Sequence, residues 1–464
     1  MSKGRCSRCF LLTTILFSFT KVETRRNHGT RGRRRQQQVI HNATLRLPLQ
    51  AESGTHHLDI YVGEPPIKRT LIIDTGSRLT AWTCSPCKAC GKKRTHYDPA
   101  QSSTSSVSLI QANITVAPTC QRSPCHFSDV SVCTNNQCSL EQRYTEGSAW
   151  SAYEVTDIIT LGGVEPATAT SRRTVQDDYD ASLLYATLPF TFGCQTSVSG
   201  LFENQYADGI LGLEFSNYSL AAALQQNGIL EEYQSQTTSP DEQPFSPQAF
   251  SLCMTLQGGW LGLGGGLVER HKEPMRKTKL RKDTARHETK SKGMYAVKVT
   301  DLWLGDKCVT CHTDRRKRRE LLESFNEDKG TILDSGTTDT YLPYPIAPIW
   351  EALWEKETGT KDAHREIFLT EDELEHLPTV RIVLDGNVSL AIPPMHYMEK
   401  GEDKNGKQRR KGNKLAWTSR MYADEPSGAV LGINAMLGHD IMFDWENGQL
   451  GVALADCDSS YAVG

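Results

Sequence analysis

The 464-residue sequence has few of the features that mark fibrous, disordered or membrane-spanning chains. Its 36 glycines and 20 prolines fall far short of a collagen composition, and 38% hydrophobic residues are too many for a disordered chain. The apolar run near the N-terminus, residues 9–20, is shorter than the roughly 20 residues that cross a membrane. We therefore expect a soluble globular body of about two or three domains.

The net charge of −3 conceals an uneven distribution. The first 36 residues hold ten Lys or Arg and one acidic residue, a local charge of +9, so the rest of the chain carries −12. Basic residues followed by a short apolar run predict a secretory signal peptide or signal-anchor over residues 1–20. Residues 21–40 then form a basic tail or a short pro-segment. Because the body is acidic, nucleic acid is not an expected partner.

Twelve of the 14 cysteines follow this tail, and seven of them lie between Cys84 and Cys138. An even number of cysteines predicts disulfides and an oxidising compartment. The C-x2-C-x2-C spacing of the first three also occurs in zinc sites, so zinc is the alternative, although no histidine follows at zinc-finger spacing. Sequons of the N-x-S/T type agree with a secretory route and lie at Asn42, Asn113, Asn217 and Asn387.

Short alternating or β-branched runs, separated by Gly, Pro and Asp, begin near Leu45 and continue along the chain. Only residues 219–232 and 346–357 have the pattern of helices. The expected class is therefore all-β with a few short helices. Two basic insertions, residues 270–292 and 315–319, are expected to be solvated surface loops, with processing sites or an anionic-membrane contact as alternatives.

The chain also repeats itself. The segment TLIIDTGS at 70–77 recurs as TILDSGTT at 331–338, and each copy is followed by an apolar pair and glycine, at 210–212 and 430–432. Two such copies predict duplicated lobes. We place the N-terminal lobe at 41–268, with a cysteine-rich insert at 84–138, and the C-terminal lobe at 269–464.

Each copy ends an apolar run in Asp followed by Ser or Thr and Gly, which delivers a carboxylate at a tight turn. If the lobes pack about a two-fold axis, Asp74 and Asp334 meet there. Two carboxylates at hydrogen-bond distance share one proton, so the pair can hydrolyse an amide by general acid–base catalysis without a covalent intermediate. The alternative is two Asp residues that cap turns in unrelated strands.

On these motifs the sequence resembles the pepsin-like aspartic proteases over about residues 45–457. The resemblance implies a bilobal β-fold, a monomer, peptide or protein substrates and no cofactor. It also implies that Asp74 and Asp334 are the catalytic pair and that Tyr144 is the tyrosine of a flap that closes over substrate. The positions expected to contact substrate are Tyr144, Glu146, Gly76, Gly336, Thr337 and Thr338.

The cysteine pattern and the flap sequence YTEGS resemble the branch that contains nepenthesins and plasmepsin V. By this resemblance the cysteine cluster is a disulfide-stapled insert, and Glu146 binds an arginine upstream of the cut. Trp82 follows Asp74 by one residue more than in gastric pepsins, so its hydrogen bond to the flap tyrosine is not carried over. Plasmepsin V relatives carry a C-terminal membrane span, so this chain is either soluble or associates with a membrane through its N-terminal segment or an absent anchor.

The resulting expectation is an aspartic endopeptidase of the secretory pathway that prefers substrates of the R-x-L type. A secreted protease of broad, nepenthesin-like specificity is one alternative. A catalytically inactive binding protein with the same fold is another, and both Asp motifs and Tyr144 argue against it.

Overall fold

We describe the protein from a computed structural model. The structure describes residues 44–91, 96–107, 120, 124–162, 186–230, 245–282, 293–361, 364–403 and 406–459. The expected signal at 1–20 and basic tail at 21–40 lie outside these residues. Within the described part of the chain, no helix is both long enough and apolar enough to cross a membrane.

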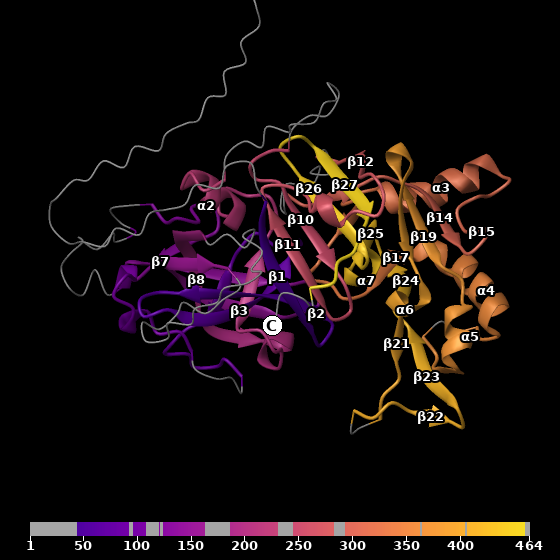
Figure 1. Ribbon diagram of the computed structural model, residues 1–464, viewed down its shortest axis with the longest axis horizontal. Coiled ribbons are helices and arrows are strands. Elements are labelled where there is room, and N and C mark those ends of the chain that lie inside the picture. Colours follow the sequence, from indigo (N-terminus) through magenta and orange to yellow (C-terminus); the bar gives the residue numbers. More distant parts are fainter. Residues whose placement is uncertain are drawn as a thin grey trace, which may run out of the picture. The chain divides into compact units, whose positions relative to one another are not determined.

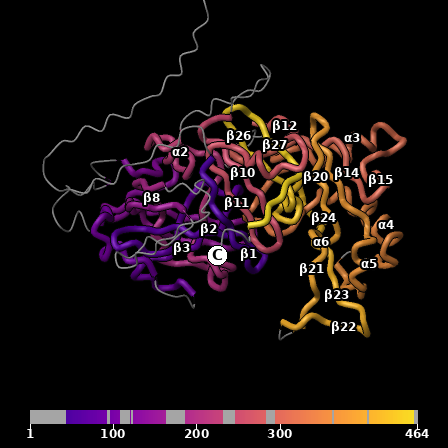
Figure 2. Tube along the Cα trace, in the orientation of Figure 1, coloured from indigo at the N-terminus to yellow at the C-terminus, as the bar shows by residue number. Residues whose placement is uncertain are grey.

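The largest element is a 14-stranded sheet that contains strands from the first lobe and the last two strands of the chain (Figures 1 and 2). Burial alternates along most of β7 Ala149–Leu161, whereas every residue of β10 Phe250–Met254 is buried. In pairing order the strands are β12 Arg276–Lys279, β27 Gln449–Leu454, β26 His439–Asp444, β10 Phe250–Met254, β11 Gly258–Leu263, β1 Leu45–Glu52, β2 Thr55–Val62, β3 Ile67–Asp74, β9 Gly209–Gly212, β4 Ala81–Thr83, β8 Ala186–Ser199, β7 Ala149–Leu161, β6 Gln137–Arg143 and β5 Val132–Thr134.

The second lobe contains three smaller sheets. The five-stranded sheet runs β13 Ala296–Val297, β16 Thr331–Leu333, β25 Ala429–Leu431, β17 Thr340–Pro343 and β24 Met421–Glu425. One four-stranded sheet runs β15 Lys307–Cys308, β14 Val299–Leu304, β19 Val380–Leu384 and β20 Val388–Ile392. The other contains β18 Ile367–Leu369, β23 Lys414–Ser419, β21 Met398–Lys400 and β22 Arg410–Lys411.

The repeated sequence forms the same strand arrangement twice. In the first copy β3 lies parallel to β9, which also pairs antiparallel with β4. In the second copy β16 lies parallel to β25, which also pairs antiparallel with β17. In both copies, therefore, the apolar strand that leads to the Asp residue lies next to a parallel partner. The predicted all-β, bilobal fold class is confirmed.

Short helices connect the strands. The second predicted helix is confirmed by α4, whereas α2 is shorter than the predicted 219–232. The α-helices are α2 Leu220–Gln226, α3 Arg315–Asn326, α4 Ala347–Thr358, α5 Glu371–Glu375, α6 Pro394–Tyr397 and α7 Ile433–Met436. The 3-10 turns are η1 Pro99–Gln101, η2 Gly200–Glu203, η3 Val268–Arg270, η4 Tyr344–Ile346 and η5 Asp385–Asn387.

The prediction that the basic segment 315–319 is a loop is wrong, because these residues begin the 12-residue helix α3. The side chain of Asp314 caps the helix by accepting a hydrogen bond from the backbone N–H of Arg316 at 2.8 Å. Leu321 and Phe325, one helical turn apart, are buried and hold α3 against the lobe. The helical conformation also disfavours cleavage here by a processing protease, which binds extended chain.

The other basic segment, 270–292, is only partly a loop. Its residues Arg276–Lys279 form β12, which pairs antiparallel with β27. Thr278 of this strand is buried, so the strand has an inner face. Residues 283–292 lie outside the described part of the chain.

The 12 cysteines of the body form six disulfides, which confirms the predicted framework and supplies its connectivity. Two bridges join distant parts of the chain, Cys84–Cys194 and Cys253–Cys457. The other four are local and are Cys87–Cys90, Cys120–Cys133, Cys125–Cys138 and Cys308–Cys311.

Candidate active site

Both carboxylates of the predicted dyad lie at the ends of buried strands. Asp74 is the last residue of β3, and Asp334 follows β16 directly. Backbone bonds fix both ends to the neighbouring strands, since Leu213 N–H donates to the carbonyl of Asp74 at 2.7 Å and Asp334 N–H donates to that of Leu431 at 3.0 Å. Backbone hydrogen bonds therefore fix both Asp residues, through the carbonyl of Asp74 and the N–H of Asp334.

The two Asp loops face each other closely. A Cβ built on Gly76 would lie 2.6 Å from Oδ1 of Asp334, and a Cβ built on Gly336 would collide in the same way with Asp74. Any side chain at either position would therefore displace the opposite carboxylate. The close backbone approach expected of glycine at these turns is therefore present, whereas neither Gly76 nor Gly336 has a positive φ.

The hydroxyls of Thr75 and Ser335 join the two loops through four hydrogen bonds. Thr75 Oγ1 donates to the carbonyl of Leu333 at 3.0 Å, and Ser335 Oγ donates to that of Ile73 at 2.8 Å. In addition, each hydroxyl accepts the backbone N–H of the other residue, at 3.1 Å and 2.9 Å. This reciprocal set is buried and holds the carboxylates in fixed relative positions.

Each carboxylate also accepts hydrogen bonds within its own loop. Gly76 N–H and Gly336 N–H each donate to the Oδ1 of their Asp at 2.9 Å. Thr337 Oγ1 donates to Oδ2 of Asp334 at 2.7 Å, and Ser77 Oγ makes the corresponding bond to Asp74.

Burial raises the pKa of Asp74 well above its ordinary value, and the negative charge of Asp334 raises it further. The hydrogen bonds from Ser77 and Gly76 act in the opposite direction. Asp74 is only 3% exposed, which explains why burial is the largest cause. A carboxyl with a raised pKa, hydrogen-bonded to a second carboxylate, is suited to hold the proton that the pair shares.

The turn 144–148 between β6 and β7 carries Tyr144 and Glu146. Tyr144 N–H donates to the carbonyl of Ser148 at 2.8 Å, and Gly147 has a φ of +98° that a glycine adopts without strain. Burial raises the pKa of the Tyr144 hydroxyl, and the charge of Asp74 adds to this effect. The tyrosine therefore lies close enough to the dyad to sense its charge.

Glu146 is exposed at this turn. The structure shows no hydrogen bond or ion pair between its carboxylate and another described residue. Its charge nevertheless contributes to the raised pKa of Tyr144. Glu146 is therefore near the flap tyrosine and available to a ligand.

The tryptophan that contacts Tyr144 is not the one near the first Asp motif. Trp150 Nε1–H donates to the Tyr144 hydroxyl at 3.3 Å. Trp82 instead stacks on Phe192, with ring centroids 3.6 Å apart. No sequence motif marks Trp150, and the signal that indicates it is its place six residues after Tyr144, on the returning strand of the hairpin.

Thr338 lies beside the β1–β2 turn, since a Cβ on Gly54 would come within 2.8 Å of its methyl group. These two residues line a hollow of about 170 Å³ together with His396 and Arg420. Arg420 Nε donates to Oδ1 of Asp339 at 2.5 Å. The hollow adjoins the second Asp loop through Thr338.

Glu214, on the other side of the first Asp loop, was also missed. Its N–H donates to the carbonyl of Ser77 at 2.9 Å, and its Oε1 accepts the N–H of Gly293 at 3.1 Å. Burial raises the pKa of Glu214 to about 7, while the N–H of Gly293 and the charge of Arg78 oppose the shift. Glu214 follows the apolar run 210–213, a position where no motif indicates a carboxylate.

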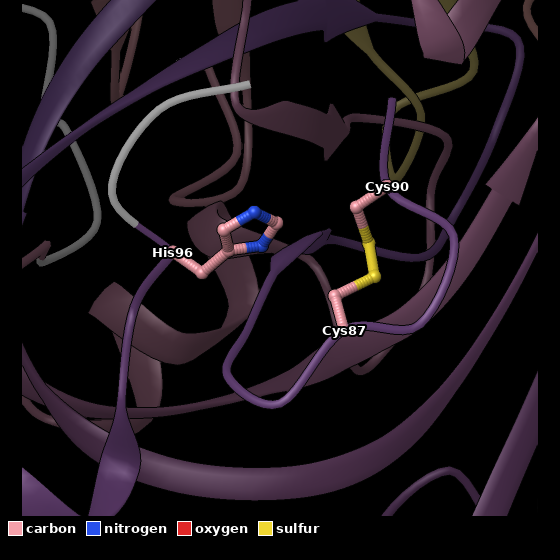
Figure 3. Close-up of side chains that lie close together, drawn as sticks. All are labelled: Cys87, Cys90 and His96. Carbon is pink, nitrogen blue, oxygen red and sulfur yellow. A yellow bond between two sulfur atoms is a disulfide. The ribbon is translucent and has the colours of Figure 1, made fainter. Parts of the chain in front are cut away.

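The arrangement of the cysteines bears on the alternative of a zinc site. His96 lies beside the Cys87–Cys90 disulfide (Figure 3), a neighbour that sequence spacing did not reveal. Each of the three clusters of cysteine with other metal-ligating residues in the described part of the chain contains disulfide-bonded cysteines. Zinc binds thiolates, so these sulfurs are not ligands while the bridges are formed.

Comparison with known proteins finds similarity to aspartic proteases. A family model described as Xylanase inhibitor N-terminal matches residues 57–265. Aspartic protease 5 of Toxoplasma gondii is 30% identical over 216 residues, which are 45% of this chain and 19% of that protein. Plasmepsin V of Plasmodium falciparum is 21% identical, with 88% of this chain and 72% of that protein covered. Aspartic proteinase 36 of Arabidopsis thaliana is 25% identical, with 91% and 79% covered.

The matches to plasmepsin V and to aspartic proteinase 36 cover most of this chain, so they span both Asp motifs. The structure brings these two motifs together between the lobes. On this basis the chain is similar to aspartic-type endopeptidases of the pepsin-like kind.

Proposed function

We propose that this chain hydrolyses peptide bonds with Asp74 and Asp334 as the catalytic pair. The observation that carries this proposal is the close approach of the two Asp loops, in which each carboxylate lies against the glycine of the other loop and accepts a hydrogen bond from its own. One carboxylate takes a proton from water as its oxygen adds to the scissile carbonyl carbon, while the other carboxyl protonates the carbonyl oxygen. Collapse of the tetrahedral adduct breaks the C–N bond, and the amine leaves with a proton from the pair.

Substitution of either dyad residue tests this mechanism. Asp74→Asn and Asp334→Asn preserve size but remove a titrating carboxyl, so each should lower kcat by roughly 10²-fold or more. The measurement is cleavage of a peptide library at pH values from about 4 to 7, read by mass spectrometry. The control is Asp306→Asn, at an exposed position. An inactive native protein, or full activity in either dyad variant, would overturn the proposal.

For specificity we propose that Glu146 selects substrates with an arginine upstream of the cut and an apolar residue at it, in the R-x-L manner. The exposed carboxylate at the flap turn supports this, because it lies near Tyr144 and has no partner among the described residues. A guanidinium group would form charge-assisted hydrogen bonds with it. A solvent-exposed Glu without a role in specificity is the alternative.

The specificity test uses peptide pairs that differ only in Arg or Ala at the upstream position. Glu146→Gln should lower kcat/KM for the Arg peptide by roughly tenfold, the scale of one charge-assisted hydrogen bond, and leave the Ala peptide nearly unchanged. Glu141→Gln is the matched control, because Glu141 is exposed on β6 of the same hairpin. Equal loss on both peptides would remove the role of Glu146 while leaving the dyad mechanism intact.

The proposed compartment is the secretory pathway or the extracellular space, and the proposed substrates are peptides or proteins. Six disulfides support an oxidising environment. The sequon residues Asn217 and Asn387 are both exposed, whereas Asn42 and Asn113 lie outside the described residues. Monomeric state, membrane association and retention within the pathway stay predictions.

An inactive binding protein is the competing function, because the matching family model carries the name of an inhibitor. An inhibitor would need the fold but not the proton that Asp74 and Asp334 share. The intact dyad, the Thr75 and Ser335 bonds and the Tyr144 contact favour catalysis. The library experiment separates the two functions directly.

A further inference from the structure

One face of α3 and a neighbouring loop form a strongly basic hollow, which the proposed protease activity does not use. Arg315, Arg318 and Arg319 line it from the helix, and Lys298 lines it from the residue between β13 and β14. Residues three and four apart lie on one side of a helix, so these arginines face the same way. The hollow has a volume of about 620 Å³.

The hollow has a fixed base. Asn326, which also lines it, accepts the backbone N–H of Val299 at 2.9 Å and donates to the carbonyl of Val299 at 2.8 Å. Leu321 and Phe325 are buried in the core and anchor α3. The positions from which the basic side chains extend are therefore set by packed structure.

Most of the positive charge around the hollow is not neutralised. Arg318 pairs with Asp301 at 3.1 Å, but the structure shows no ion pair between Arg315, Arg319 or Lys298 and any other described residue. Glu323 is the acidic residue of the lining. Because the chain after its basic tail carries a net −12, this concentration of cations is opposite to the general charge of the body.

The lining indicates the chemistry of the ligand. Leu322 is the one hydrophobic residue among the seven that line the hollow. Guanidinium groups bind phosphate through paired N–H donors, and several such groups match an anion with several charges better than a single carboxylate. The volume falls within the range of small-ligand sites, roughly 300–1,000 Å³.

We propose that this hollow binds a compact anion bearing more than one phosphate group. The group can belong to a free phosphorylated molecule or to a lipid headgroup, since the recognition chemistry is the same. Binding would localise or regulate the protein independently of the substrate cleft.

The test measures binding of inositol hexakisphosphate to the full chain by calorimetry. The double substitution Arg315→Glu and Arg319→Glu should weaken binding at least tenfold, because each charge-assisted contact contributes about that factor. The same helix offers a charge-matched control, Arg316→Glu and Lys317→Glu, because these residues do not line the hollow. The control should bind within about twofold of the native protein, a difference of a few tenths of a kcal/mol.

Two further arms identify the source of the phosphate. Flotation with phosphatidylcholine vesicles, with and without phosphatidylinositol phosphate, tests a lipid headgroup, and competition by inositol hexakisphosphate tests a soluble anion. Binding in either arm that the hollow variant loses and the control keeps supports the proposal. Absence of binding in both arms, equal loss in the two double variants, or binding of poly-glutamate in place of the phosphates would overturn it. Unfolding curves for both double variants exclude loss of the fold as the cause.

Discussion

Ser77 lies close both to Asp74, the first carboxylate of the proposed pair, and to Tyr144 of the flap turn. Its hydroxyl donates to Asp74 and is near enough to the Tyr144 hydroxyl to oppose the rise in the pKa of Tyr144. The Thr337 hydroxyl makes the corresponding bond to Asp334. The two halves of the site are thus alike in their bonds to the carboxylates, whereas the contact with the flap tyrosine gives Ser77 a second role.

Ser77→Ala should move the alkaline limb of kcat/KM to higher pH. The Ser77 hydrogen bond stabilises ionised Asp74 and lowers its pKa, so its removal raises that pKa. Activity requires one proton on the pair of carboxyl groups. The Ala variant therefore keeps this proton, and with it its activity, up to a pH that is higher by up to about one unit. The measurement is a pH profile of peptide cleavage. Ser77→Thr, which keeps a hydroxyl, should retain the native profile, and a limb that stays in place or moves down in the Ala variant would contradict the assignment.

At the scale of elements, the hairpin of β6 and β7 positions Tyr144 through a residue of the hairpin itself. Trp150 is 2% exposed and packs with Leu140 and Phe202, so its ring is fixed. Its Nε1–H then reaches the tyrosine hydroxyl. We therefore predict that Trp150 is a positioning residue, which would act on the proposed catalysis through Tyr144.

Trp150→Phe keeps an aromatic ring and deletes the donor, so it should lower kcat/KM by roughly two- to tenfold, the scale of one hydrogen bond. A double-mutant cycle distinguishes positioning from general stability. In a Tyr144→Phe background the hydroxyl acceptor is gone, and Trp150→Phe should then have little further effect. Additive losses would mean that Trp150 supports only the packing of the hairpin. The control is Trp82→Phe, at the tryptophan that stacks on Phe192. Its effect on kcat/KM should add to that of Tyr144→Phe.

The sequence predicted those parts of the site that lie within a single short motif. The two Asp motifs and Tyr144 lie in short segments whose residue types follow from their chemistry, and the structure brings the carboxylates together. Helix α3 was missed because its first five residues are all basic, and its apolar Leu321 and Phe325 show a periodicity too short to recognise. Trp150 and Glu214 were missed because their contacts depend on strand pairing and on burial, which no single segment encodes.

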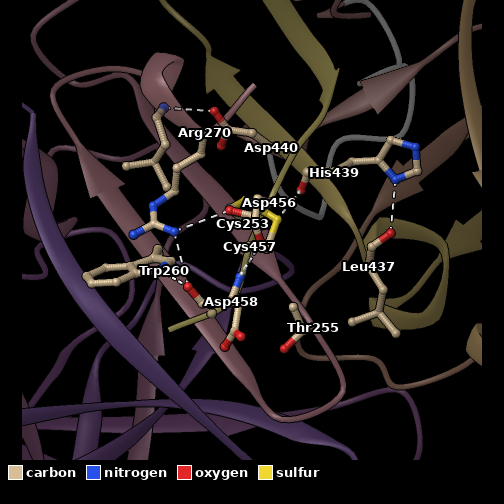
Figure 4. Close-up of a disulfide and its surroundings, with 12 residues drawn as sticks. Cys253, Thr255, Trp260, Arg270, Leu437, His439, Asp440, Asp456, Cys457 and Asp458 are labelled. Carbon is tan, nitrogen blue, oxygen red and sulfur yellow. Dashed lines mark hydrogen bonds between the residues drawn. A yellow bond between two sulfur atoms is a disulfide. The ribbon is translucent and has the colours of Figure 1, made fainter. Parts of the chain in front are cut away.

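At the scale of the whole molecule, the last two strands close the fold. Strand β26 pairs with β10, so residues 441 and 443 lie opposite residues 252 and 250. The disulfide Cys253–Cys457 reinforces this closure, and Arg270 covers the nearby ring of Trp260 at 4.5 Å (Figure 4). The end of the chain is thereby fastened to the strands that precede the second lobe.

The disulfides should accordingly differ in what they contribute to stability. The bridge Cys253–Cys457 closes a sequence separation of 204 residues, and Cys308–Cys311 closes one of 3. In the chain-entropy model the longer loop restricts the unfolded chain by about 5 kcal/mol and the short one by about 1.5 kcal/mol. Replacing both cysteines by Ala should therefore lower the free energy of unfolding by about 3.5 kcal/mol more at 253 and 457 than at 308 and 311. The measurement is denaturant unfolding with the other bridges intact. Equal losses in the two variants would show that β26 and its pairing with β10, rather than the covalent link, close the fold.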